Sequence, residues 1–92
     1  MAGSGSLWVQ PSEHKAVGAC LAAARRRAKL TQQELAQHLD KPQSFVSDYE
    51  RGQRRLDLLE FLLVAQALRH DPRDLFEQIL RSLPLSPRTP GS

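Results

Sequence analysis

The polar residues from Gln43 to Arg51 are the part of this sequence whose types and spacing could do chemistry. In QSFVSDYER, the side chains of Ser44, Ser47, Asp48 and Arg51 project together from a helix that turns about 100° per residue. A glutamine amide can bond an adenine edge twice, a serine hydroxyl can serve either base, and a helix N-terminus attracts phosphate. These residues therefore predict a face that contacts nucleic-acid bases, with an ordinary solvated helix face as the alternative.

The other residues of this helix are expected to face the interior. A buried face centred on Val46 places Tyr49 and Glu50 on or near it and Phe45 on its flank. A carboxylate tilted toward apolar surroundings needs a cation or amide donors. Because Arg25 lies four residues after a core leucine, we expect an Arg25–Glu50 ion pair. A solvent-exposed Glu50 without a partner is the alternative.

Amide and basic side chains border this helix. Five of them stand where they could contact a phosphate backbone, two at the start of the preceding helix and three just past Tyr49: Gln32, Gln33, Arg51, Arg54 and Arg55. Arg26, Arg27 and Lys29 add charge at the end of the first helix. The net charge of the whole chain is +3, which permits an anionic partner without requiring one.

Five helices and no strand are expected to position these residues, because good helix formers dominate and β-branched residues are rare. Capping boxes of Thr31 with Glu34 and of Asp57 with Glu60 mark two helix starts. The expected helices run from Ser12 to about Lys29, from Thr31 past Leu39, within Pro42–Gly52, from Asp57 to near Arg69, and from Asp71 onward, where Pro72 takes the first helical position. The link Asp40–Pro42 is so short that the helices around it must pack at a steep angle, as in a helix-turn-helix.

Length and composition restrict the remaining possibilities. The 92 residues suffice for one domain, expected at 12–83 between a flexible N-terminal arm at 1–11 and a flexible, proline-rich tail at 84–92. No apolar run approaches the roughly 18 residues that cross a membrane, and a single cysteine favours a reducing, cytoplasmic location. The three histidines lack ligand-like spacing and no nucleophile motif is present, so we expect no metal, no cofactor and no enzymatic activity.

The stretch LDLLEFLLVAQAL carries more apolar residues than one buried stripe needs. Those expected to serve the core are Leu58, Phe61, Val64, Ala65 and Leu68. The leucines left over, with apolar residues further along, are expected to form a homodimer interface: Leu59, Leu62, Leu63, Ile79, Leu80 and Leu83. The alternative is that the fifth helix and residues 83–85 fold back and cover this strip within the monomer.

The sequence from Val17 to Leu80 resembles the Xre/Cro family, the phage-repressor-like helix-turn-helix domains. The resemblance rests on LTQQELA (Leu30–Ala36), PQSFVSDYERG (Pro42–Gly52) and VAQAL (Val64–Leu68). It implies an all-α, five-helix, lambda-repressor-like domain that binds double-stranded DNA sequence-specifically. Members of the family usually bind a two-fold operator as dimers and usually repress transcription.

The resemblance also implies roles for particular residues. By position, the base-reading residues of the family fall on Gln43, Ser44, Ser47 and Asp48, its phosphate-contacting glutamine on Gln32, and its buried ion pair on Arg25 and Glu50. Asp48 departs from the neutral or basic residue often found at its position. Because its carboxylate would repel phosphate, it must accept a hydrogen bond from a cytosine amine, pair with Arg51, or stand clear.

A bacterial or phage transcriptional repressor is the function that the sequence predicts. One alternative is the antitoxin of a toxin–antitoxin pair, which binds a toxin and represses its own operon. Another is a protein-interaction module that kept the fold and lost DNA binding, which the modest charge and Asp48 favour. The sequence specifies neither the operator nor the sign of regulation.

Overall fold

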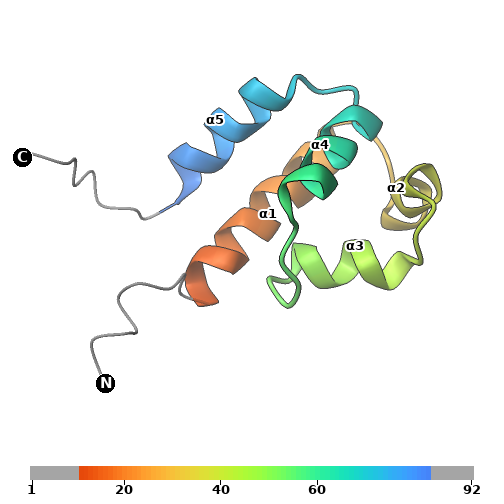
Figure 1. Ribbon diagram of the computed structural model, residues 1–92, viewed down its shortest axis with the longest axis horizontal. Coiled ribbons are helices and arrows are strands. Elements are labelled where there is room, and N and C mark those ends of the chain that lie inside the picture. Colours follow the sequence, from red (N-terminus) through yellow and green to blue (C-terminus); the bar gives the residue numbers. More distant parts are fainter. Residues whose placement is uncertain (1–10, 84–92) are drawn as a thin grey trace, which may run out of the picture.

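Five helices and no strand make up residues 11–83, the part of the chain that this computed structural model describes (Figure 1). They are α1 Pro11–Arg27, α2 Gln32–Leu39, α3 Gln43–Glu50, α4 Leu58–Ala67 and α5 Pro72–Ser82. The expected all-α fold with five helices is therefore confirmed. The tail expected at 84–92 and most of the expected arm lie outside the described residues, but Pro11, assigned to the arm, is the first residue of α1.

Side-chain caps fix where α2, α4 and α5 begin. The Thr31 hydroxyl accepts the Glu34 amide at 3.0 Å, and the Glu34 carboxylate accepts the Thr31 amide at 2.8 Å. Asp57 and Glu60 exchange the same two bonds at 2.7 and 2.9 Å. Asp71 caps α5 through its carboxylate. Both predicted capping boxes are confirmed, and each satisfies amides that the first helical turn leaves free.

Left-handed residues end three of the helices. Lys29, Asp40 and Arg69 have φ values of 63°, 57° and 55°. A residue in this region cannot continue a right-handed helix, so α1 ends at Arg27 rather than near Lys29. Asp40 closes α2 by donating its amide to the Ala36 and Gln37 carbonyls, and the two-residue step to α3 follows directly.

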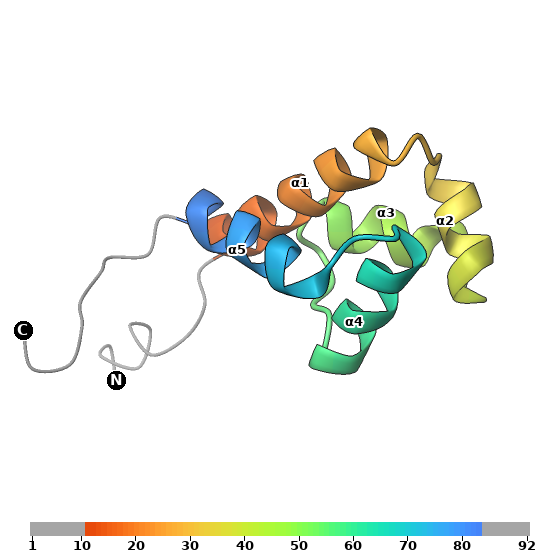
Figure 2. The same cartoon turned by 90° about the horizontal axis from the view of Figure 1, so that it is seen from above.

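The helices enclose one core, to which each contributes. The largest fully buried side chains are Leu21, Leu35, Val46, Val64 and Leu75, one from each helix. Burial of an aliphatic side chain of this size is worth about 1.5–3 kcal/mol. α1 packs against both α3 and α5, whereas α2 packs on α3 and α4, so that α2 and α5 lie at opposite ends of the domain (Figures 1 and 2).

Gly18 sets the distance between α1 and the end of α3. A Cβ atom on this residue would lie 2.3 Å from the Glu50 carbonyl oxygen and 2.4 Å from that of Tyr49. Both contacts are with backbone atoms, which cannot rotate away. Only glycine therefore lets α1 approach the end of α3 this closely.

Burial differs from the sequence-based expectation at four residues. Leu58, expected in the core, is 75 % exposed because it is the first residue of α4 and lies beyond its packing neighbours. Ile79, expected in a dimer interface, is only 6 % exposed because it follows Leu75 by one turn on the inner side of α5. Phe45, expected on the flank of α3, is buried. Leu83, also assigned to the interface, packs partly buried against the core.

No helix within residues 11–83 combines the length and the apolar character that a membrane span requires.

Candidate nucleic-acid interface

The outer side of α3 carries the residues predicted to read bases. Gln43 and Ser44 are exposed in the first turn, and Ser47 and Asp48 follow half-buried one turn later. Pro42, the residue before α3, makes no side-chain cap. The amides of Gln43 and Ser44 consequently lack the side-chain acceptors that serve α2 and α4, and they are directed toward any ligand at this end of the helix.

The ion pair expected between Arg25 and Glu50 is present behind α3. The Arg25 Nε donates to Glu50 Oε2 at 2.7 Å, and its Nη2 donates to Oε1 at 3.1 Å. The two side chains are only 10 % and 5 % exposed, and Arg25 also donates to the Leu30 carbonyl at 2.8 Å. The hydrogen bond to Glu50 raises the pKa of Arg25 above its ordinary value. This two-pronged pair joins α1 to the end of α3.

Hydrogen bonds continue from this pair to the surface. The Gln32 amide nitrogen donates to Glu50 Oε1 at 2.9 Å, and the Gln43 amide nitrogen donates to Gln32 Oε1 at 3.3 Å. A carboxylate only accepts, so Glu50 forces Gln32 to turn its NH₂ group inward and its carbonyl toward Gln43. Gln43 must then turn its own NH₂ group toward Gln32. The orientation of this exposed amide is thus set by a buried carboxylate.

The oriented Gln43 side chain keeps one N–H and its carbonyl oxygen for an outside partner. Such an adjacent donor and acceptor complement the N7 acceptor and the N6 amine on the major-groove edge of adenine. The sequence identified both glutamines, but the bond between them was not expected, because it depends on the spacing of α2 and α3 in space.

Asp48 pairs with Arg51 on the same side of α3. The Arg51 Nη2 atom lies 3.0 Å from Asp48 Oδ1, and the two side chains are 60 % and 40 % exposed (Arg51 and Asp48, respectively). Of the three possibilities that the sequence left open for Asp48, the structure contains this pairing. Exposed pairs contribute only about 0–1 kcal/mol, so either partner could exchange the other for DNA at small cost.

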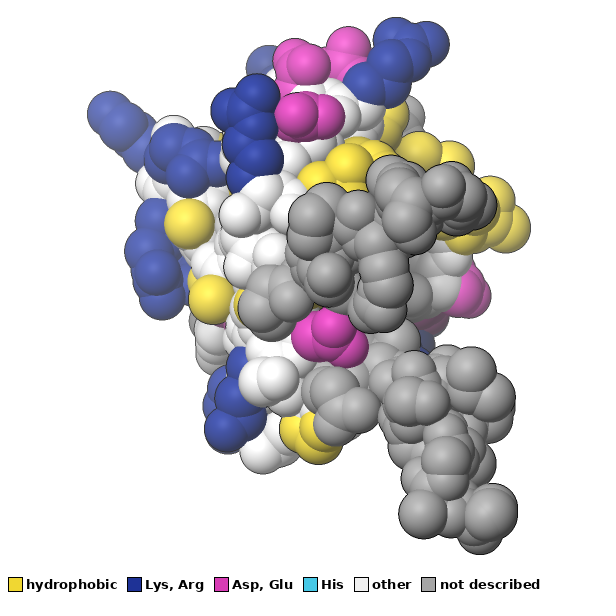
Figure 3. All heavy atoms as spheres, turned by 90° about the vertical axis from the view of Figure 1, so that its left-hand side faces the viewer, with side chains coloured by type: hydrophobic (Ala, Val, Ile, Leu, Met, Phe, Trp, Pro, Cys, Tyr) yellow, Lys and Arg dark blue, Asp and Glu magenta, His cyan; other side chains and the backbone are white. Residues whose placement is uncertain are grey.

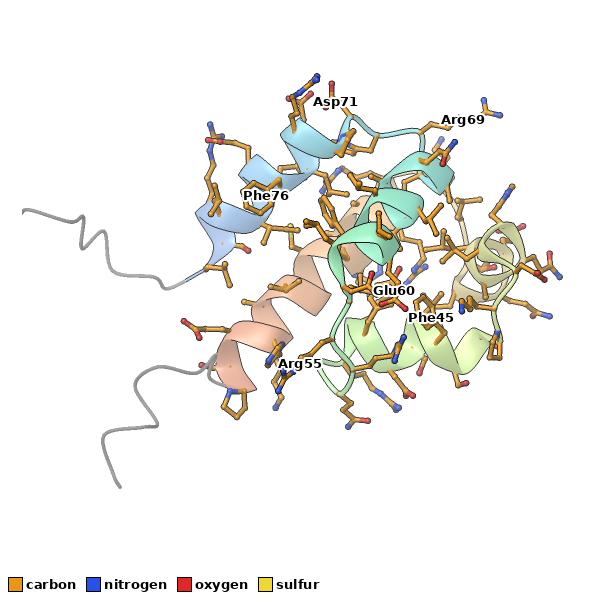
Figure 4. All side chains as sticks on the ribbon, in the orientation of Figure 1. Phe45, Arg55, Glu60, Arg69, Asp71 and Phe76 are labelled. Atoms are coloured by element: carbon orange, nitrogen blue, oxygen red, sulfur yellow. The ribbon has the colours of Figure 1, made fainter. Side chains whose placement is uncertain are left out.

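Phe45 lies beneath two cations that sequence reasoning had not connected with it. The Arg54 guanidinium is 4.7 Å from the ring centroid, and the Lys41 ammonium is 5.6 Å from it. Arg54 also donates to the Glu60 carboxylate at 2.7 Å. In the view of Figure 4, Phe45 of α3 and Glu60 of α4 lie near one another, and Arg54 contacts both side chains. These contacts hold the segment between α3 and α4 against α3.

The residues predicted to contact phosphate fall into two groups. Gln32 and Arg51 join the hydrogen bonds around α3, and Gln33 is exposed beside Gln32 in the first turn of α2. Arg54 is engaged by Glu60, and Arg55 is exposed at the rim of a cavity near the start of α1. Gln32 and Arg51 make hydrogen bonds with residues predicted to read bases, whereas Arg54 and Arg55 make none with them.

A different surface, formed by α4 and α5, is apolar. Its exposed side chains, which we call the leucine surface, are Leu59, Leu62, Leu63, Phe76 and Leu80, between 43 % and 71 % exposed. On the face shown in Figure 3, hydrophobic side chains gather on the right, whereas Lys and Arg side chains are more numerous on the left. α5 does not cover α4 here, so the alternative in which it hides these leucines does not hold for residues 11–83. No group of three potential metal ligands occurs in that range.

The same arrangement of helices occurs in known proteins. A helix-turn-helix family model matches residues 21–75. A search of curated proteins gives no significant match. Among solved structures, the restriction-modification controller protein C.AhdI from Aeromonas hydrophila is 35 % identical over 72 % of this chain and 96 % of its own, with a TM-score of 0.67.

Two further solved structures are similar. An XRE-family like protein from Pseudomonas syringae pv. tomato str. DC3000 is 38 % identical, with a TM-score of 0.68 over 79 % of this chain and 89 % of its own. The clp gene regulator ClgR from Corynebacterium glutamicum is 25 % identical, with a TM-score of 0.71 over 77 % and 91 %.

Proposed function

The chain belongs to the Xre helix-turn-helix family of DNA-binding transcription regulators, and from this premise we propose that it represses transcription as a homodimer on a two-fold operator. The observation that carries the proposal is the run of hydrogen bonds from Arg25 through Glu50 and Gln32 to Gln43. It holds a base-reading amide in one orientation before any DNA is bound, and such preorganisation reduces the entropy lost on binding.

In this proposal α3 enters the major groove by its N-terminal end. Gln43 and Ser44 meet base edges first, and Ser47 and Asp48 follow along the groove. The N-terminus of α2, with Gln32 and Gln33, lies against the phosphate backbone and fixes the register. Much of the affinity comes from such phosphate contacts, so it falls as the salt concentration rises.

The leucine surface is the proposed dimer contact. Leu59, Leu62 and Leu63 repeat at helical spacing along α4, and an apolar patch of this kind on a small domain often marks a protein interface. A two-fold dimer would place two copies of α3 about one helical turn of DNA apart, roughly 34–36 Å. The operator is then an inverted repeat with that spacing.

Selection of bound sequences from a random DNA pool tests the proposal. We expect an inverted repeat with half-sites about one helical turn apart, including an adenine at the position read by Gln43. A Gln43→Ala variant should lose the base preference at that position, at a cost of about 1–3 kcal/mol. Gln37→Ala, which changes an exposed glutamine of α2 away from its N-terminus, is the matched control.

The same experiment addresses the second candidate, an interaction module without DNA binding. The acidic Asp48 on the reading side is the observation that favours it. A chain that enriches no sequence even at low salt would support the module and contradict the repressor proposal. A single half-site without symmetry would contradict the dimer but retain the reading role of α3.

A further inference from the structure

A cavity of about 380 Å³ opens beside the first turns of α1, away from the reading residues. Most of its lining is apolar, and its walls come from α1, the α3–α4 link, α4 and α5: Val17, Leu21, Leu56, Phe61, Phe76 and Ile79. Charged and polar groups stand at the rim, among them His14 and Arg55. A hollow of this size and polarity in a small core calls for an apolar occupant.

Tyr49 requires that the occupant of the cavity also carry a group that can hydrogen-bond. It is part of the cavity lining, and its hydroxyl is buried without a hydrogen-bond partner among residues 11–83. Burial, and next the Glu50 carboxylate, raise the pKa of Tyr49, so the hydroxyl keeps its proton. Buried hydroxyls in folded proteins almost always have a partner. The occupant should therefore combine apolar bulk with one group that can hydrogen-bond.

The sequence offers such an occupant immediately before α1. Leu7, Trp8 and Val9 are three consecutive apolar residues after a run of Gly, Ala and Ser. Trp8 precedes Pro11 by three residues, which allows it to reach about 10 Å from the start of α1. Since Val17 is in the second turn of α1 and lines the cavity, this reach is sufficient. The indole N–H is a donor, and the Tyr49 hydroxyl oxygen can accept it.

We propose that Leu7–Val9 folds back over the first turns of α1 and fills this cavity, with the Trp8 indole against Tyr49. The segment then completes the core of its own chain. It also supports α3 from behind, because Tyr49 belongs to α3 and faces the interior. This inference concerns packing within the domain and does not depend on DNA binding.

Trp8 is the only tryptophan of the chain, so its fluorescence reports on the proposed site. In the full chain we expect a blue-shifted emission and acrylamide quenching several-fold weaker than in urea. Phe76→Lys changes a half-exposed wall residue and should release Trp8, which would restore strong quenching. Leu80→Lys, at similar exposure on the same helix but outside the wall, is the control and should leave Trp8 protected. Circular dichroism verifies that both variants are folded.

Three results would overturn the proposal. One is a Trp8 that is quenched in the folded full chain as strongly as in urea. Another is protection that disappears on dilution, which would assign the cavity to the segment of a second copy. The third is protection without nuclear Overhauser contacts from the Trp8 indole to Val17 methyl groups or the Tyr49 ring. Contacts that persist on dilution support the proposal.

Discussion

The α3 surface and the leucine surface differ in what their side chains already contact. On α3, Gln43 and Asp48 are each held by a partner within the domain. On α4, Leu59 and Leu63 are 71 % and 55 % exposed, and no residue in the range 11–83 covers them. A partner of α3 meets groups whose directions are fixed beforehand, whereas a partner of α4 need only supply apolar area. Under the proposed function, specificity resides in the first surface and assembly in the second.

Loss of the buried Arg25–Glu50 pair, which holds the end of α3, should have the largest effect on stability. Arg25→Met leaves the Glu50 carboxylate buried without its cation, and we expect the free energy of unfolding to fall by about 3–5 kcal/mol. Urea denaturation measures the loss. The exposed neighbour provides the control, since Arg26→Met should change stability by less than about 0.5 kcal/mol. An unchanged denaturation midpoint for Arg25→Met would show that the pair does not support α3.

A change that disturbs the close approach of α1 to α3 should have the next largest effect on stability. Gly18→Ala introduces a Cβ atom where backbone oxygens of Tyr49 and Glu50 already lie, and we expect a loss of about 1–3 kcal/mol. The gain in helix propensity from glycine to alanine, at most about 1 kcal/mol, opposes this loss only partly. Thermal unfolding measures the difference, with Ala19→Ser on the exposed side of α1 as the control. A more stable Gly18→Ala protein would contradict the assigned helix spacing.

A charge on the leucine surface should separate assembly from folding. We expect Leu63→Lys to leave the unfolding free energy of the monomer within about 0.5 kcal/mol and to raise the dimer dissociation constant at least about tenfold. Sedimentation velocity at several concentrations measures the second quantity, with Gln37→Lys on α2 as the control. A Leu63→Lys protein that unfolds would place this leucine in the core instead.

The smallest effect on stability is expected for Asp48→Ala. Because the pair with Arg51 is exposed, its loss should cost less than about 1 kcal/mol of folding stability. The change removes a charge that repels phosphate and frees Arg51, so binding should tighten for all DNA sequences alike and its salt dependence should steepen. Gel shifts over a salt series measure this, with Asp74→Ala on α5 as the control. A changed preference at one base would instead identify Asp48 as a reader.

Local signals explain why much of the fold could be predicted. Thr31 with Glu34 and Asp57 with Glu60 act within one helical turn, so their sequence spacing suffices to locate two helix starts. The Arg25–Glu50 pair was also accessible, because helical periodicity places both side chains on the core side and a buried carboxylate requires a cation.

Features that depend on contacts between distant segments could not be predicted in this way. Helical periodicity predicted the side of its helix on which each of Leu58 and Ile79 lies, but not what covers that side. Leu58 was therefore wrongly assigned to the core, and Ile79 to an interface. The bond from Gln43 to Gln32 and the cations over Phe45 depend on the distances between helices. Basic residues on both sides of an aromatic, as in Lys41 and Arg54 around Phe45, were the only available signal.

Gln43 is tied to the scaffold through Gln32, whereas Ser44 stands exposed at the start of α3 without that constraint. A residue at position 43 that cannot donate to the Gln32 carbonyl would free Gln32 to move and would unsettle its bond to Glu50. We therefore expect the two sites to follow different evolutionary routes. If Gln43 and Ser44 read bases as proposed, a new operator preference can arise by a single substitution at Ser44, but at Gln43 it requires a compensating change at Gln32, so that the two glutamines are expected to change together.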